Sequence, residues 1–334
     1  MKAFIVKNYG KKEKLQVTDW AEPTVHENDV LVQVHAAGVN LLDALIRNGE
    51  FKLFLPYKPP FVNGHDMAGV VTKVGSKVSR FKVGDEVYSR VSDHRIGTFA
   101  AYIAVEEKDV ALKPKNLSME EAGSIPLVGL TAWQALVEIG KVKKGQKVFI
   151  QAGSGGVGTF AIQLAKHLGA YVASTTSTKN FDLVKDLGAD LVIDYKTEDF
   201  ETRLKDYDLV LHSNRDTKVL EKSLRILKPG GQLISLVGPP TPEFATVIGL
   251  PWHLKLITKL LSAGAKKKAK KLDAHFSFLF MRADGSQLSE ITRLMEAGII
   301  KPVIDRLFPF EQTNEALAYV ETGRSKGKVV IKMK

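Results

Sequence analysis

The stretch KVFIQAGSGGVG, residues 147–158, decides how this chain folds. Residues 148–150 form the short apolar run typical of a buried strand, and residues 157–168 place apolar side chains at helical spacing. The glycines between them follow the G-x-G-x-x-G pattern, which lets a backbone approach a pyrophosphate at the start of a helix. We therefore expect a dinucleotide to bind at Gly153, Gly155, Gly156, Val157 and Gly158; the alternative is an ordinary glycine-rich turn.

Further apolar runs follow this stretch, with helical patterns between some of them. These runs are residues 171–173, 191–193, 209–211 and 232–237. Continuous apolar strands separated by helices predict a parallel sheet covered on both faces. The region 239–273 is helical in pattern but interrupted by Pro242 and Pro251, and residues 275–280 could form a last strand.

The N-terminal third of the chain has a different rhythm. Short β-rich runs at residues 30–34, 69–74 and 86–88 predict an antiparallel β-barrel-type domain. Turns are expected beside these runs at Gly38, Gly64, Gly75 and Gly84, and an irregular loop at Pro56, Pro59 and Pro60. At the other end of the chain, residues 288–295 predict a helix and residues 328–331 a closing strand.

Composition limits the class of protein. The 334 residues fit two domains, and 44% apolar with 25% charged residues is a globular composition. The absence of cysteine excludes disulfides, thiolate nucleophiles and zinc sites that need sulfur. No apolar run reaches the length of about 20 residues that spans a bilayer, and the apolar stretch at residues 3–6 is too short for a secretion signal. We therefore expect a cytoplasmic protein without a membrane span.

The net charge of +11 is concentrated in part in KKKAKK, residues 266–271. We interpret this run as a solvated helix face, with a polyanion-binding or membrane-surface patch as the alternative. Aromatic residues are not interleaved with the lysines in a way that suggests stacking on bases, so no nucleic-acid partner is expected.

The segment STTSTKN, residues 174–180, indicates which dinucleotide binds. An NAD site usually places an acid about 20 residues beyond the glycines, where it bonds the ribose 2′-hydroxyl. Here no acid occurs before Asp182, and the hydroxyls of Thr176 and Ser177 and the ammonium of Lys179 would instead bind a 2′-phosphate. The segment favours NADPH; the alternative is an exposed polar turn with a helix cap.

Metal and nucleophile chemistry find little support in the residues. His65 and Asp66 could suggest a zinc ligand with an acidic partner, but further ligands at suitable spacing are missing. We expect no metal and interpret His65 as a hydrogen-bonded loop histidine. The chain also lacks the G-x-S-x-G, H-E-x-x-H and Walker patterns.

Taken together, several motifs resemble the medium-chain dehydrogenase/reductase superfamily. They are GVN (38–40) with Asp43, GHD (64–66) before GVV (69–71), GDEV (84–87), residues 122–132, the glycine motif and LGAD (187–190). Asn40 stands where zinc-dependent alcohol dehydrogenases carry a cysteine ligand, and the four-cysteine lobe is absent, as in the zinc-free quinone oxidoreductase branch. Within that branch, the chain is most similar to the enone (alkenal/one) oxidoreductases. The motifs for this are STKN (177–180), IDY (193–195), KPVID (301–305) and GKVV (327–330).

This resemblance implies an α/β architecture: a GroES-like β-barrel domain, residues 1–124 and 284–334, and a Rossmann domain with a doubly wound parallel sheet, residues 125–283. It implies NADPH-dependent reduction of quinones or α,β-unsaturated carbonyls without zinc, by a homodimer joined through the last Rossmann strand. The implied cofactor-binding residues, beyond the glycine motif with Val157, are Asn40, Thr131, Thr176, Ser177, Lys179, Tyr195, Val237, Phe278, Phe280 and Arg324.

Each of these residues outside the glycine motif has a plainer alternative. Asn40 could cap the next helix, Thr131 could cap a helix or pack within it, and Phe278 and Phe280 could be strand core. Tyr195 could be a strand-end aromatic and Arg324 a surface charge. The chain also departs from the family at LHSNR, residues 211–215, where relatives usually show an acid and a glycine.

Hydride transfer to an enone or quinone leaves negative charge on the substrate oxygen, and a hydrogen-bond donor aimed at that oxygen lowers the barrier. Tyr57 and Lys58, in the proline-rich loop, are our candidate catalytic donors; they could equally be loop surface. Two other functions stay open. One is a dinucleotide-binding structural or regulatory protein whose basic patch meets RNA or a membrane surface, and the other is a zinc-free alcohol dehydrogenase.

Overall fold

The computed structural model describes residues 1–55 and 57–333, so Pro56 of the predicted proline-rich loop lies outside the described residues. The chain forms two compact units, each described by itself. The first unit combines Met1–Leu130 with Arg282–Lys334, and the second is Thr131–Met281. The chain passes from the first unit to the second within the helix α3 (Pro126–Trp133).

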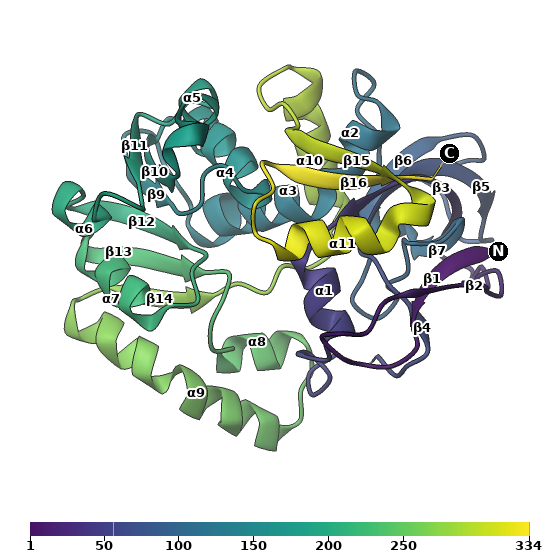
Figure 1. The fold of residues 1–334 in the computed structure, drawn as a ribbon, viewed down its shortest axis with the longest axis horizontal. Coiled ribbons are helices and arrows are strands. Elements are labelled where there is room, and N and C mark those ends of the chain that lie inside the picture. The colour runs from purple at the N-terminus through teal and green to yellow at the C-terminus, as the bar shows by residue number, and fades with distance from the viewer. Residues whose placement is uncertain (56, 334) are drawn as a thin grey trace. The chain divides into compact units, whose positions relative to one another are not determined.

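The second unit is built on a six-stranded sheet in the order β11-β10-β9-β12-β13-β14, in which every pairing is parallel (Figure 1). Its strands are β9 (Lys147–Ile150), β10 (Tyr171–Thr176), β11 (Leu191–Asp194), β12 (Tyr207–His212), β13 (Leu227–Ser235) and β14 (His275–Phe278). Val148, Phe149 and Ile150 of β9 are all fully buried, as expected for a strand covered on both faces. The sheet confirms the predicted Rossmann fold.

Helices connect these strands. They are α4 (Gly156–His167), α5 (Phe181–Asp186), α6 (Phe200–Arg203), α7 (Thr217–Arg225), α8 (Pro242–Val247) and α9 (Trp252–Lys271). Helices α4 and α5 pack on β9, β10 and β11, whereas α7 packs on β12 and β13. The strand order reverses between the neighbours β9 and β12, and ligands of such sheets bind at the carboxyl ends of the strands beside this point.

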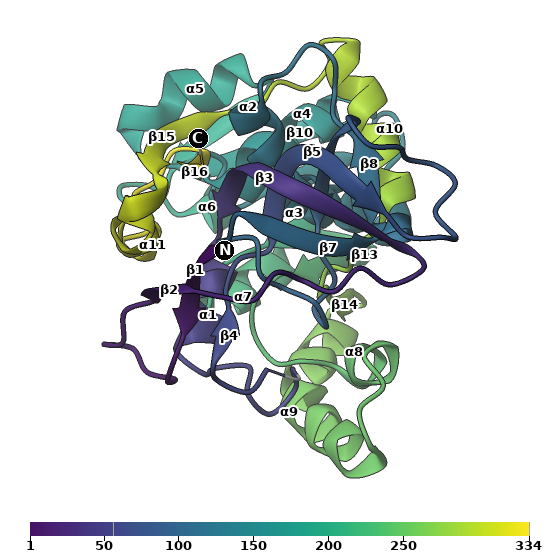
Figure 2. The ribbon, with the colours of Figure 1, turned by 90° about the vertical axis from the view of Figure 1, so that its right-hand side faces the viewer.

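The first unit contains two sheets. A three-stranded sheet has the order β2-β1-β4, and a seven-stranded sheet has the order β15-β16-β3-β5-β6-β8 with β7 paired to β3 (Figure 2). The strands are β1 (Lys2–Val6), β2 (Gln16–Asp19), β3 (Asp29–Val39), β4 (Phe61–Val62), β5 (Asp66–Val74), β6 (Glu86–Arg90), β7 (Tyr102–Glu106), β8 (Val110–Leu112), β15 (Ile304–Pro309) and β16 (Lys328–Lys332). Only β15 and β16 pair in parallel among them, so the predicted antiparallel architecture is confirmed for the described strands.

The helices of the first unit are α1 (Leu41–Arg47), α2 (Met119–Gly123), α10 (Gly285–Glu296) and α11 (Thr313–Glu321). The closing strand predicted at residues 328–331 is β16, which pairs with β3. A buried apolar core joins β3 and its neighbours to Leu317 of α11 and Val329 and Ile331 of β16. The first and last segments of the chain thus share one hydrophobic core.

Three local expectations need correction. Gly38 lies inside β3 rather than in a turn, because the chain passes so close to α2 that a Cβ there would lie 2.5 Å from the carbonyl oxygen of Gly123. Strand β10 continues through Thr176, so the polar segment begins as buried strand. Pro242 does not interrupt a helix, since it is the first residue of α8, whereas Pro251 lies in the break between α8 and α9, as predicted; both positions suit a residue with a fixed φ and no N–H.

Candidate active site

The glycine turn between β9 and α4 divides its glycines between two tasks. A Cβ on Gly153 would lie 2.2 Å from the Ser174 hydroxyl, and one on Gly158 would lie 2.3 Å from the carbonyl oxygen of Ala152, so these two glycines permit close packing. Gly155 differs, because its only neighbour within 4 Å of such a Cβ would be that same oxygen, at 3.3 Å. Apart from this tight contact, no other atom of the described residues beyond its chain neighbours lies within 4 Å of such a Cβ, so the space beside Gly155 is otherwise open.

That space adjoins the N-terminus of α4. Gly155 is the N-cap residue, in extended backbone geometry, and no side chain caps the helix. The N–H groups of the first turn are consequently free of a side-chain acceptor, and the positive end of the helix dipole points the same way. Ala152, just before the glycines, has a left-handed φ of 54°, a conformation that costs a non-glycine residue about 1 kcal/mol or more. The turn holds this strained geometry and offers an anion a cradle of backbone donors.

Polar side chains gather beside the turn at the carboxyl end of β10. The hydroxyl of Thr176 donates to that of Ser154 at 2.9 Å, and the amide of Asn180 donates to the same Ser154 oxygen at 3.1 Å. Ser177 is buried, whereas Lys179 is exposed. The Oδ1 atom of Asn180 is buried and has no hydrogen-bond partner among the described residues. This edge therefore keeps an unused acceptor next to hydroxyls and a cation.

The acid at the end of the neighbouring strand β11 already has hydrogen-bond partners in the chain. Asp194, at the end of β11, accepts hydrogen bonds from the backbone N–H and the hydroxyl of Thr178 and from the N–H of Lys196. The Thr178 hydroxyl and these amides hold the pKa of Asp194 below its usual value. The Asp194 carboxylate therefore holds the loop after β10 in place. The next residue, Tyr195, is exposed.

The unusual segment 211–215 is buried only at its start, because Leu211 and His212 end β12, whereas Asn214 and Arg215 are exposed. His212 is almost fully buried, and burial lowers its pKa to about 4, so its imidazole is neutral at physiological pH. Its Nδ1 atom has no partner among the described residues. Gln151, directly after β9, accepts from the N–H of Ser213 at 3.1 Å and donates to Ser223 at 2.9 Å. A histidine and a glutamine therefore line the reversal point of the sheet.

Three predicted cofactor residues lie near the end of the sheet formed by β13 and β14. Val237 is half-buried just beyond β13, and its carbonyl accepts from the Ser235 hydroxyl. The rings of Phe278 and Phe280 both pack edge-on against Phe244, with centroids 5.6 and 5.0 Å apart. Packing against Phe244 is therefore enough to explain why phenylalanine stands at positions 278 and 280.

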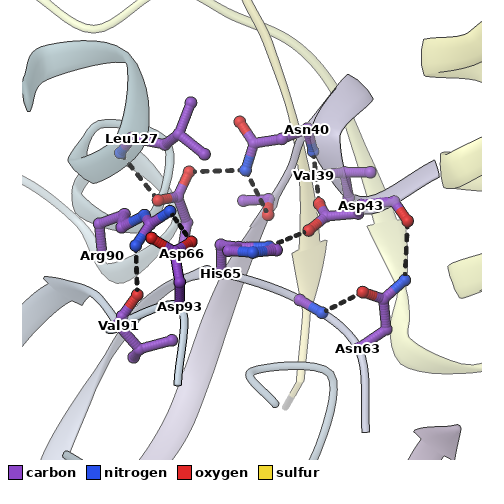
Figure 3. Close-up of polar contacts among 12 residues, drawn as sticks. Val39, Asn40, Asp43, Asn63, His65, Asp66, Arg90, Val91, Asp93 and Leu127 are labelled. Carbon is purple, nitrogen blue, oxygen red and sulfur yellow. Dashed lines mark hydrogen bonds and ion pairs between the residues drawn. The ribbon is translucent and has the colours of Figure 1, made fainter. Parts of the chain in front are cut away.

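In the first unit, Asn40 sits in a buried polar network (Figure 3). It is the N-cap residue of α1, and its backbone N–H donates to the Asp43 carboxylate at 2.7 Å. Its side-chain amide donates to Asp66 at 3.0 Å, and its amide oxygen accepts from the ammonium of Lys328. Both ends of the amide are thus held by partners inside the first unit, which leaves Asn40 little freedom to turn toward a ligand.

The same network pairs two charges that are removed from water. Asp66 is fully buried and also accepts from the N–H of Leu127 at 2.8 Å, and Lys328 lies 3.3 Å from its carboxylate. Burial raises the pKa of Asp66, and the Lys328 ammonium opposes this rise. His65 bonds the Asp43 carboxylate through Nδ1 at 2.6 Å, as expected for a hydrogen-bonded histidine. Its Nε2 atom is buried and has no partner among the described residues.

The two predicted donors of the proline-rich loop differ. Tyr57 packs on Phe61 with ring centroids 5.2 Å apart, and its hydroxyl is buried without a hydrogen-bond partner in the described part of the chain. Burial raises the pKa of Tyr57, so its phenol stays protonated and able to donate. Lys58 is exposed.

Two other predicted cofactor residues lie elsewhere: Thr131 is buried within α3 rather than capping it, and Arg324 is exposed after α11.

Sequence reasoning missed Ser154, Asn180 and Lys328 as members of these clusters. Ser154 stands at a variable position of the glycine motif, and Asn180 ends a polar run, so both offered only a weak signal. Lys328 contacts Asn40 from 288 positions away, which no local pattern reveals.

Within residues 1–55 and 57–333, no group of three or more His, Asp or Glu side chains could hold a metal ion. Over the same residues, no helix is long and apolar enough to cross a membrane.

Known proteins match this chain over nearly its whole length. Residues 26–115 match the family described as alcohol dehydrogenase GroES-like domain, and residues 187–331 match the family described as zinc-binding dehydrogenase. The chain is 38% identical over 342 residues to 2-methylene-furan-3-one reductase of Solanum lycopersicum, covering 99% of this chain and 79% of the relative. This chain belongs to the medium-chain dehydrogenase/reductase superfamily.

Two further comparisons agree with this membership. The chain is 36% identical to the NADPH-dependent alkenal/one oxidoreductase, chloroplastic, of Arabidopsis thaliana, over 99% of this chain and 79% of the relative. The structure of the quinone oxidoreductase from Coxiella burnetii superposes with a TM-score of 0.85 at 30% identity, covering 100% of this chain and 99% of that one. The resemblance inferred from the sequence is confirmed. As a medium-chain dehydrogenase/reductase, the chain is an oxidoreductase that depends on a nicotinamide dinucleotide.

Proposed function

We propose that this medium-chain reductase uses NADPH to reduce quinones or α,β-unsaturated carbonyls without a metal ion. The observation that carries the proposal is the open cradle at Gly155, flanked by hydroxyls and a cation at the end of β10. The relatives named as an alkenal/one oxidoreductase, a 2-methylene-furan-3-one reductase and a quinone oxidoreductase support the substrate class. Their names join enones and quinones, both of which accept hydride at an electrophilic centre conjugated to oxygen.

The residues present fit a diphosphate nucleotide. The cradle would fill if Gly155 carried a Cβ, and backbone N–H groups at the start of α4 suit the pyrophosphate. We assign the extra phosphate of NADPH to Ser177 and Lys179, with Thr176 and Tyr195 beside them. Asp194 does not offer its carboxylate to the ribose hydroxyl of an unphosphorylated nucleotide, because it already accepts hydrogen bonds from the N–H and the hydroxyl of Thr178.

NADPH, when bound, supplies the hydride. The contribution of the chain is to hold the nucleotide and to stabilise the negative charge that develops on the substrate oxygen. The Tyr57 phenol is buried, protonated and unpartnered among the described residues, which makes it the better of the two proposed donors. Lys58 is exposed and would act only through its charge. Solvent can supply the proton that completes the reaction.

The remaining predicted contacts and associations stay proposals. Asn40, Thr131, Val237, Phe278, Phe280 and Arg324 are proposed around the nicotinamide and adenosine parts of the cofactor. Homodimerisation through β14 and a cytoplasmic location are proposed as well. Relatives of this chain are named as chloroplastic in one case and mitochondrial in another, so the location needs its own test by cell fractionation.

The experiment is to follow loss of reduced nicotinamide with a panel of quinones and enones, using NADPH and NADH in parallel. We expect turnover with NADPH, and we expect Lys179→Ala to raise the KM for NADPH about 10- to 100-fold, the value of one charge-assisted hydrogen bond. The same change should leave the KM for NADH as it is, and Lys185→Ala, another α5-region lysine, is the matched control. Preference of the wild-type protein for NADH would contradict the proposal.

A further inference from the structure

Helix α9 does not bury its large apolar side chains, as an ordinary surface helix of a globular protein does. Its buried residues are small: Thr258, Ser262, Ala265 and Ala269. Ala265 and Ala269 belong to the hydrophobic core of the second unit. The hydroxyls of Thr258 and Ser262 donate hydrogen bonds to carbonyl oxygens of the same helix, and the bond from Ser262 to the carbonyl oxygen of Thr258 measures 2.8 Å. The side chains that attach α9 to its own domain thus carry little apolar area.

The large apolar side chains of α9 point outward instead. Trp252, Leu256 and Leu260 follow one another at four-residue spacing, and Trp252 is 77% exposed and Leu260 69%. Ile257 and Leu261 form a second exposed row beside them. A helix of a globular protein normally turns such a stripe toward the core, so this stripe is available to something outside the second unit.

The charges on α9 are all of one sign. Seven lysines and no acidic residue occur between Trp252 and Lys271, and the last six residues are the basic run 266–271. Lys266 and Lys268 form ion pairs with Glu243 of α8 and Glu221 of α7, whereas Lys267, Lys270 and Lys271 are exposed. Helices α8 and α9 lie together beyond β14 within the second unit (Figure 2). The stripe is therefore continuous with a strongly cationic surface.

We propose that α9 is an interfacial helix that lies on a membrane containing anionic lipids. Its leucines, isoleucine and tryptophan would enter the boundary between headgroups and acyl chains, while its lysines would extend to the lipid phosphates. A second copy of this chain fits less well, because it would bring a second set of seven α9 lysines to the contact and no opposite charge. A nucleic acid would use the lysines but leave the row from Trp252 to Leu261 in water.

The test is flotation of the full-length protein with vesicles. One set contains phosphatidylcholine and phosphatidylglycerol in equal parts, and the other contains phosphatidylcholine alone. We expect the protein to float with the anionic vesicles at low salt and to be released by high salt, because lysine attraction to the surface is screened. On binding, the fluorescence of Trp252 should shift to the blue and become protected from acrylamide. The Trp252→Phe variant should lose that shift.

Two pairs of variants separate the apolar and the charged contributions. Leu256→Gln with Leu260→Gln should weaken binding to anionic vesicles about 10-fold or more. Leu307→Gln, in the first unit, is the control, since Leu307 is 52% exposed and Leu256 50%. All of these side chains are exposed, so unchanged far-ultraviolet circular dichroism is expected throughout.

Neutralising Lys267 and Lys271 to Gln should weaken binding about 30-fold, at about fivefold for each lysine near the surface. The exposed pair Lys11 and Lys12 in the first unit is the control and should change nothing. The proposal is overturned if the wild-type protein stays in solution with anionic vesicles, or if the leucine and lysine variants float as well as the wild type. It is overturned equally if the leucine variant converts a dimer into a monomer without vesicles, because the stripe would then be covered by a second copy.

Discussion

Replacing Gly155 by alanine separates nucleotide binding from folding. The added methyl would meet only the carbonyl oxygen of Ala152, at 3.3 Å, and Gly155 has an ordinary φ of −82°. The cost in the free energy of unfolding is therefore at least about 0.5–1 kcal/mol, because alanine is a poorer N-cap residue than glycine and its methyl would contact that oxygen tightly. The methyl would however occupy the space in front of α4 that a pyrophosphate needs.

The expected loss of affinity follows from the hydrogen bonds that the methyl blocks. Keeping a phosphate oxygen out of reach of one or two backbone N–H groups removes about 1.5–3 kcal/mol, which raises the Kd for NADPH about 10- to 100-fold. Titration calorimetry with NADPH measures this change, and circular dichroism with a thermal melt checks the fold. No hydride acceptor is needed, so the result is independent of the substrate.

Gly264→Ala is the matched control for this change. Gly264 lies in α9 with nothing within 4 Å of an added Cβ, so its replacement should leave NADPH binding unaltered and stabilise the helix by about 0.5–1 kcal/mol. If folded Gly155→Ala bound NADPH as tightly as the wild type, the diphosphate would not lie at this turn, and the argument from the cradle would be wrong.

Three further changes have defined outcomes. Gly158→Ala should yield little folded protein on expression, because its Cβ would lie 2.3 Å from a backbone oxygen that cannot move; a yield and melting temperature like those of Gly155→Ala would contradict this. Lys328→Met should lower the stability of the first unit by about 3–5 kcal/mol in a thermal melt, since buried Asp66 loses its cation, and adding Asp66→Asn should restore part of it. His212 binds a proton more readily when unfolded, because its folded pKa is about 4, so stability is full above about pH 6.5 and falls by about 3 kcal/mol as the pH drops to 4. The His212→Gln variant should show a correspondingly smaller loss of melting temperature over that range, and an equal loss would refute the assignment.

Much of the second unit could be predicted from short stretches of the sequence. Most of its parallel strands contain a short apolar run, and the glycine motif marks the turn where a backbone must approach a phosphate. The extent of β10 and the regular helix α9 were not predicted, because hydroxyl residues such as Ser174 and Thr175 look like a turn until neighbouring strands bury them. Prolines can likewise mark the beginning of a helix or a break in one, and only the backbone of residues 242–271 decides between the two.

The sequence by itself determined the sheet of the second unit, the glycine turn and the hydroxyl-rich edge, because these depend on neighbours within a few positions along the chain. Tertiary structure alone decided that the amide of Asn40 is held by Lys328 and Asp66, and that α9 turns its leucines outward. The physical reason is the same in both cases. Burial and pairing depend on which distant segments pack together, and a periodic pattern shows that a helix has an apolar face without showing which face the rest of the chain covers.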